Sequence, residues 1–158
     1  MNGEEKLKEL DNILEEYEQL HGIHIVDSNI DKYLHMSRED IGRLDAESCT
    51  EIAFEIARHS IYVQQQYNKE RGRVKWCTAT IHYYCVPEWK NHKEYFKDDI
   101  RIAAISQKEN FDHIRKLIKI KNHAEQRVER LYGMAAGIKY LSDILLEQAK
   151  TKRYIGRN

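Results

Sequence analysis

Cysteine and histidine, which bind metals or act as nucleophiles, gather at Cys77, His82 and Cys85. On a helix of about 3.6 residues per turn, His82 lies roughly 140° and Cys85 roughly 80° around the axis from Cys77. The three side chains therefore do not converge on one ion, and a zinc site also needs a fourth ligand. We predict no metal site and no cofactor, and we interpret Cys49, Cys77 and Cys85 as small apolar core residues.

Sequence motifs that indicate a specific catalytic mechanism do not occur in the sequence. It has no glycine-rich phosphate loop, no HExxH pair and no nucleophile elbow. Neighbours such as Asp112 and His113 are pairings that chance gives in a chain with eight histidines. We predict that the protein is not an enzyme.

Basic residues form a more informative group. The first cluster lies beside aromatic residues and comprises Lys69, Arg71, Arg73, Lys75 and Trp76. The second lies in a stretch with an excess of cations and comprises Arg115, Lys116 and Lys119. Clustered cations attract a phosphate backbone, and aromatic rings stack on bases. Both clusters are candidate nucleic-acid-binding segments, with the alternative that these cations are solvated and paired with nearby glutamates.

The net charge of zero, from 26 basic and 26 acidic residues, makes the distribution of charge decisive. Residues 4–18 are strongly acidic, whereas the tail after Glu147 is basic. No apolar run approaches the roughly 18 residues of a membrane span, and the acidic N-terminus is unlike a secretion signal. We expect a cytoplasmic protein with no membrane partner.

Helix is the expected secondary structure, because one proline and seven glycines leave few chain-breaking residues. Apolar residues at three- and four-residue intervals predict a helix over residues 4–20. Residues 21–36 are expected to form a connector with a short helix around 29–34. Ser37 and Asp40 resemble a capping box that opens a further short helix, which would end at Leu44.

Two long helices are expected over residues 46–86 and 92–151. Asp45 is a helix N-cap, and Pro87 disfavours helical geometry in the residue before it. A seam with heptad spacing runs from Ile56 to Tyr84, and a similar pattern continues beyond the proline. We predict an all-α fold in which these helices form a long antiparallel hairpin, with a residue near 103–107 facing Arg71. This division gives an acidic N-terminal region, 1–44, and a hairpin with a basic tail, 45–158.

Assembly is expected because so long a second helix cannot be buried by one compact domain. The residues that we expect to pack between subunits are Gly133, Gly137, Ile138 and Leu145. Small residues four apart let helix backbones approach closely. The alternative is that the two glycines only soften the helix. The sequence therefore predicts a helical homo-oligomer.

A family resemblance rests on residues 67–76, YNKERGRVKW, and residues 81–84, IHYY. These segments resemble the phage recombination mediator family typified by UvsY, and the similarity extends over about residues 45–150. It implies an oligomeric helical protein that binds single-stranded DNA and helps to load a recombinase onto strands coated with single-strand-binding protein. The family's DNA-contacting basic pair falls on Arg71 and Arg73, with Lys75 adjacent. A phage origin would place the protein in the host cytoplasm.

Two functions thus remain as expectations. The first is a single-stranded DNA-binding recombination mediator. The second is a helical structural or adaptor protein, for instance a virion or scaffold component, whose charges only solubilise it.

Overall fold

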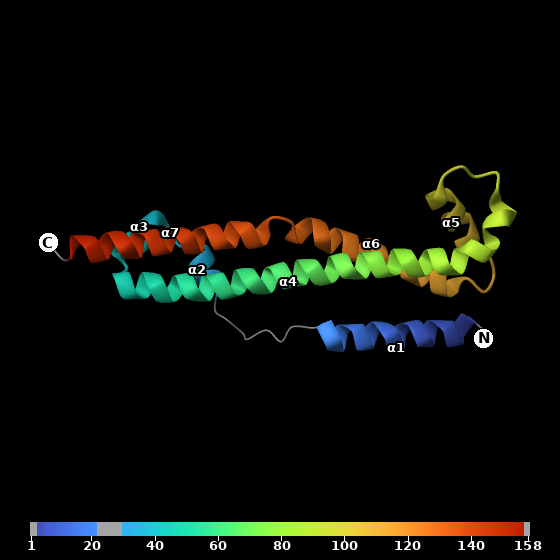
Figure 1. Cartoon of the computed structure of the whole chain (residues 1–158), viewed down its shortest axis with the longest axis horizontal. Coiled ribbons are helices and arrows are strands. Elements are labelled where there is room, and N and C mark those ends of the chain that lie inside the picture. The colour runs from blue at the N-terminus through green and yellow to red at the C-terminus, as the bar shows by residue number, and fades with distance from the viewer. Residues whose placement is uncertain (1–2, 22–29, 157–158) are drawn as a thin grey trace. The chain divides into compact units, whose positions relative to one another are not determined.

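A computed structural model describes residues 3–21 and 30–156 of the chain. These residues form helices joined by turns, and no strand occurs among them (Figure 1). In chain order the elements are α1 (Gly3–His21), α2 (Asp31–Leu34), α3 (Arg38–Arg43), α4 (Ala46–Cys85), the 3-10 helix η1 (Val86–His92), α5 (Asp98–Ser106), α6 (Asp112–Leu131) and α7 (Met134–Ile155). The predicted all-helical fold, with a long helix and a shorter N-terminal one, is confirmed.

The short helices α2 and α3 lie where the sequence predicts them. Ser37 and Asp40 form the capping box, since the Asp40 amide donates to Ser37 Oγ at 3.1 Å and the Ser37 amide donates to Asp40 Oδ2 at 2.9 Å. Ser37 Oγ also donates to Asp40 Oδ2 at 2.7 Å, and this bond, followed by the one from the Ser37 amide, holds the pKa of the Asp40 carboxyl below its usual value. Residues 22–29 of the predicted connector lie outside the described residues.

The long helix α4 begins and ends as its sequence predicts. The Ser48 amide donates to Asp45 Oδ1 at 2.7 Å, which satisfies one of the free N–H groups of the first turn. The helix ends at Cys85, and Pro87 lies in the first turn of η1, where the missing N–H costs nothing. The bounds 46–85 confirm the first predicted long helix.

The prediction of one continuous helix over 92–151 is wrong. Residues 86–92 are a 3-10 helix, and α5, α6 and α7 follow as separate helices. Asn110 lies before α6 with φ of 68°, and Gly133 lies between α6 and α7 with φ of 76°. A left-handed conformation cannot continue a right-handed helix, and asparagine and glycine are the residues that adopt it most readily. The absence of proline therefore did not guarantee continuity.

The chain divides into two compact units. Unit 1 consists of Met1–Gly22 and Asn68–Glu129, and unit 2 consists of Ile23–Tyr67 and Arg130–Asn158. Helix α4 contributes its first part to unit 2 and its second part to unit 1. Among the described residues, each helix is either too short or too polar to span a lipid bilayer.

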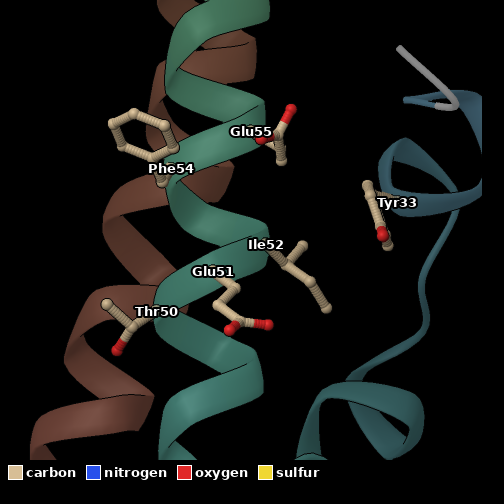
Figure 2. Close-up of a pocket in the computed structure, with 6 residues that line it drawn as sticks. All are labelled: Tyr33, Thr50, Glu51, Ile52, Phe54 and Glu55. Carbon is tan, nitrogen blue, oxygen red and sulfur yellow. The ribbon is translucent and has the colours of Figure 1, made fainter.

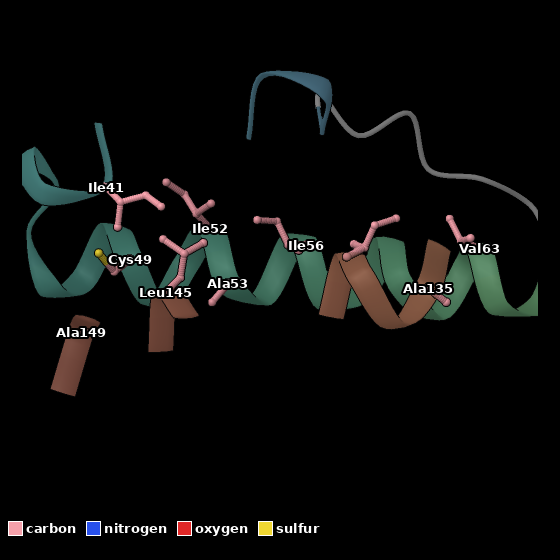
Figure 3. Close-up of a cluster of buried hydrophobic side chains, with 10 residues drawn as sticks. Ile41, Cys49, Ile52, Ala53, Ile56, Val63, Ala135, Leu145 and Ala149 are labelled. Carbon is pink, nitrogen blue, oxygen red and sulfur yellow. The ribbon is translucent and has the colours of Figure 1, made fainter. Parts of the chain in front are cut away.

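The core of unit 2 forms between α4 and α7, with α3 alongside (Figure 3). Ser60 Oγ donates to the Ala135 carbonyl at 3.0 Å, and Ser142 Oγ donates to the Ala53 carbonyl at 2.8 Å. From the first pair to the second, the residue number rises along α7 and falls along α4. The two helices are therefore antiparallel. Each buried hydroxyl is satisfied by the facing backbone, which fixes the register between the helices.

Lys152 ties α7 to the end of α3. Its Nζ donates to the carbonyls of Ile41, Gly42 and Leu44, at 3.3, 2.8 and 2.5 Å. The last carbonyls of a helix have no partner within the helix, and a cation there also interacts favourably with the negative end of the helix dipole. One lysine of the basic tail therefore serves the fold.

The core of unit 1 gathers apolar side chains from α1, α4, α5 and α6. Its buried members are Leu10, Cys77, Ile81, Cys85, Ile105, Ile114 and Leu117. Burial raises the pKa of the Cys77 and Cys85 thiols to about 11, so both are protonated at neutral pH. Both cysteines thus pack as small apolar residues, and all three cysteines are free thiols.

Candidate nucleic-acid interface

A buried carboxylate joins the two basic stretches in unit 1. Glu70 is fully buried, with Oε2 3.3 Å from Arg73 Nη1 and Oε1 3.2 Å from Arg127 Nη2. A buried anion is tolerated only when it is paired, and here one carboxylate is paired with two guanidinium groups. Glu70 is the acidic residue within the first basic cluster of the sequence. It is therefore buried rather than on the surface, and the two arginines more than balance its charge.

Helical spacing places further basic and aromatic side chains on the side of Arg73 and Arg127. Residues three and four apart share a helix face, so Lys69 and Trp76 lie beside Arg73 on α4. On α6 the same rule aligns Lys116, Lys119 and His123 with Arg127. We call this surface the cationic face, and its residues are Lys69, Arg73, Trp76, Lys116, Lys119, His123 and Arg127.

The other side of the same helix pair has mixed charge. Arg71 and Lys75 line a groove of about 200 Å³ with Glu125 and Glu129, over Val74 and Val128. This placement corrects the expected register, because Arg71 lies near Glu125 and Glu129 rather than near residues 103–107. The reason is that residues 86–111 form η1, α5 and their turns, so the helix that packs on α4 begins only at Asp112. The alternating basic residues of α4 are thus divided between two surfaces.

Arg115 is engaged within the fold. Its guanidinium donates to the Ser106 carbonyl and the Asp112 carboxylate, and it lies 3.5 Å from the Lys108 carbonyl. These bonds connect the end of α5 to the start of α6. Arg115 is therefore a positioning residue for this turn, although a role in DNA contact stays a prediction.

Exposure differs among the other predicted binding residues. Arg71, Lys75 and Lys119 are exposed, Lys69 is half-buried, and the Arg73 side chain is only 12% exposed. Trp76 is half-buried and packs against the core of unit 1, so only part of its ring is available for stacking. Within the cationic face, Lys119 and Arg127, whose side chain is 52% exposed, are the residues most open to phosphate contacts.

The residues expected to pack between subunits all lie in or before α7. Ile138 and Leu145 belong to the core of unit 2, and Gly133 forms the turn that precedes the helix. A Cβ added at Gly137 would meet nothing within 4 Å. The Gly133 and Gly137 pair therefore serves no close helix approach within the described chain, and its role between subunits stays a prediction.

His113 is a buried titratable group near the start of α6. It is 1% exposed, and its ring lies edge-on to Tyr84 with centroids 4.9 Å apart. Neither ring nitrogen has a hydrogen-bond partner among the described residues. Burial, and then the charge of Lys6, lowers the pKa of His113. The imidazole is therefore neutral at pH 7, and its protonation would place an unpaired charge in the core.

We expect acid to destabilise the fold through His113. Because its pKa is lower in the folded than in the unfolded protein, the unfolded chain binds the proton first, and stability falls as pH decreases below about 6.5. One proton limits this contribution to about 1.4 kcal/mol per pH unit. Urea unfolding at several pH values checks the expectation. His113→Phe should flatten the profile, while the exposed control His35→Gln should not; an unchanged profile in His113→Phe would exclude this group.

A pocket in unit 2 offers a different kind of surface (Figure 2). It has a volume of about 500 Å³ and is lined by Tyr33 of α2 and by Thr50, Glu51, Ile52, Phe54 and Glu55 of α4. Two carboxylates beside aromatic and aliphatic side chains disfavour a phosphate. This pocket is thus unsuited to nucleic acid and would fit an apolar or cationic group of a protein.

Comparison with known proteins gives no relative. No protein-family model matches the chain, and neither a curated protein nor a solved structure matches it.

Sequence reasoning missed two features of the site. The heptad seam from Ile56 to Tyr84 includes Glu70, but the seam does not indicate that Arg73 and Arg127 pair with this carboxylate. Sequence reasoning also counted the cations of α6 without sorting them by face. The signal was available for the second point, because Lys116, Lys119, His123 and Arg127 follow each other at steps of three and four residues. The first point required the register between α4 and α6.

Proposed function

We propose that the protein binds single-stranded DNA through the cationic face and acts as a recombination mediator. In this role it would help to load a recombinase onto strands coated with single-strand-binding protein. The resemblance of residues 45–150 to the phage mediator family supports the proposal. We further propose that α4 is one arm of an antiparallel hairpin and that hairpins from several chains assemble into a homo-oligomer.

One observation carries the proposal: Arg73 of α4 and Arg127 of α6 meet at the buried Glu70. This contact brings two cationic stretches that are distant in sequence onto one surface of a single chain. Lys69 and Lys119 extend that surface on the two helices. A row of cations with the intervening acid buried suits a phosphate backbone, whose binding is largely electrostatic.

Two double variants with equal changes in charge test the assignment. Lys69→Ala with Lys119→Ala removes two cations from the cationic face, and Arg71→Ala with Lys75→Ala removes two from the acid-lined groove. For single strands, each lost phosphate contact lowers the slope of log K against log salt by about 0.7. We expect the first variant to lose about 1.4 in slope and at least about tenfold in affinity for oligothymidylate. The control should change by less than half as much.

Fluorescence anisotropy titrations measure both quantities, and circular dichroism checks that each variant is folded. If the first variant bound as tightly as the unmodified protein, the cationic face would be excluded. If the groove variant lost more, the binding surface would lie on the Arg71 side of α4. In both cases binding by the unmodified protein would still support the DNA-binding function.

The second candidate, a helical adaptor without nucleic-acid binding, is favoured by the apolar surface of unit 2. Phe54 and Ile61 are exposed, and their seven-residue spacing places them on one face of α4. The pocket in Figure 2 lies on the same helix. This candidate would be favoured if the protein retained no oligonucleotide in a filter-binding assay at low salt. A monomer in light scattering would contradict the assembly that both candidates assume.

A further inference from the structure

The N-terminal helix α1 carries a strong negative charge and lies in unit 1 beside the cationic face. Between residues 4 and 18 the sequence has seven acids and two lysines. The acids are Glu4, Glu5, Glu9, Asp11, Glu15, Glu16 and Glu18. A helix of this composition resembles a phosphate backbone in charge. Its position therefore bears on how the cationic face is used.

A direct ion pair joins α1 to that face. Both oxygens of Asp11 accept from Lys116 Nζ, at 2.6 and 2.5 Å. Leu10, the residue directly before Asp11, is 5% exposed and packs in the core of unit 1. The ion pair is half-buried, since the side chains of Lys116 and Asp11 are 43% and 46% exposed. Ion pairs that solvent reaches are weak, and solvent ions or phosphates can replace one partner.

Helix α1 runs parallel to α6, so that acids of α1 lie opposite cations of α6. Lys6 lies over the Tyr84 ring, with Nζ 5.5 Å from the centroid, and Tyr84 contacts His113. Asp11 then reaches Lys116, so α1 and α6 run in the same direction (Figure 1). One turn beyond Asp11, Glu15 lies on the same face of α1, level with the turn of α6 that follows Lys116. That turn contains Lys119.

We propose that α1 is an acidic cover for the α6 part of the cationic face, and that the phosphates of a DNA strand displace it by replacing Asp11 at Lys116. The inference rests on the proposed function, since it assigns a regulator to the same surface. The covered state lowers affinity for DNA because the strand must compete with carboxylates that are tethered to the same chain. Displacement of α1 frees Lys116, a residue of the cationic face, for contact with a phosphate.

Variants that replace carboxylates with uncharged amides of nearly the same shape test the proposal. Asp11→Asn with Glu15→Gln removes two charges from the side of α1 that faces α6. Glu125→Gln with Glu129→Gln makes the same change in net charge on the opposite side of α6. We expect the α1 variant to bind an oligothymidylate of about 20 nucleotides roughly three- to tenfold more tightly than the unmodified protein, and the control to gain less than half of that. Equal gains in both variants would show an effect of net charge alone and would overturn the proposal.

Hydrogen exchange of α1 provides a second readout. We expect amides within residues 3–21 to exchange faster when the unmodified protein is saturated with the oligonucleotide, because the helix leaves the surface. Slower or unchanged exchange in α1 would overturn the proposal. The two claims also fail differently. Absence of binding by every variant would refute DNA binding itself, whereas binding that is insensitive to Asp11 and Glu15 would refute only the cover.

Discussion

Replacing Glu70 with glutamine is expected to destabilise the protein by about 3 kcal/mol. The substitution keeps the size of the side chain but leaves Arg73, which is 12% exposed, without its buried anion. Breaking a buried ion pair by removing one partner costs roughly 3–5 kcal/mol. We expect the lower part of that range because Arg127 is half-exposed and can turn to solvent. Urea unfolding followed by circular dichroism measures the change.

Two further variants separate charge burial from other effects. Glu125→Gln removes an exposed acid of α6 that lies 3.7 Å from Lys121, and it should change stability by less than about 1 kcal/mol. Glu70→Leu combined with Arg73→Leu removes both buried charges, and apolar replacements of this kind are often neutral or stabilising. A loss below about 1 kcal/mol in Glu70→Gln would mean that the carboxylate is not buried as described.

Leu145→Ala is the second substitution with a large expected effect. Leu145 is fully buried in the core of unit 2, where it packs with residues of α4. Truncation of a buried leucine to alanine costs roughly 2–5 kcal/mol, because transfer energy is lost and a cavity remains. We expect a loss of about 3 kcal/mol in the free energy of unfolding. Urea titration of the purified variant measures it.

Leu146→Ala is the matched control for that experiment. Leu146 is the next residue of α7 and is 38% exposed, so its truncation removes less buried surface. We expect it to cost less than about 1.5 kcal/mol. Equal losses in the two variants would contradict the assignment of Leu145 to the core and of Leu146 to the surface.

The ends of α4 were predictable because local chemistry determines them. Asp45 caps the first turn, and Pro87 follows the last residue by two positions. The seam positions were also predictable from heptad spacing, since Ile56, Ser60 and Glu70 are all buried. A polar residue at a seam position did not exclude burial, because each found a partner on the facing helix.

The second half of the chain was not predictable from periodicity alone. Its apolar residues keep a helical period across Asn110 and Gly133, yet both adopt positive φ and interrupt the helix. The segment between η1 and α6 also shifts the register of α6 on α4. A residue that faces another across two helices depends on this register. The pairing of Arg127 with Glu70, and hence the cationic face, therefore required the three-dimensional structure.

The predicted binding residues were only partly separable in the sequence. Lys69 and Arg73 are four apart and share a face, as do Arg71 and Lys75, so the existence of two surfaces followed from helix geometry. Which surface also receives cations from α6 did not follow. In the structure Arg71 and Lys75 lie beside Glu125 and Glu129, whereas Arg73 lies with Arg127.

The most direct test of DNA binding is a titration of the unmodified protein with fluorescent oligothymidylate at several salt concentrations. We predict saturable binding whose affinity falls steeply with salt. A slope of log K against log salt of about −2 to −3 would correspond to three or four phosphate contacts on the cationic face. Absence of binding at about 50 mM salt, or binding that is independent of salt, would contradict the proposed function.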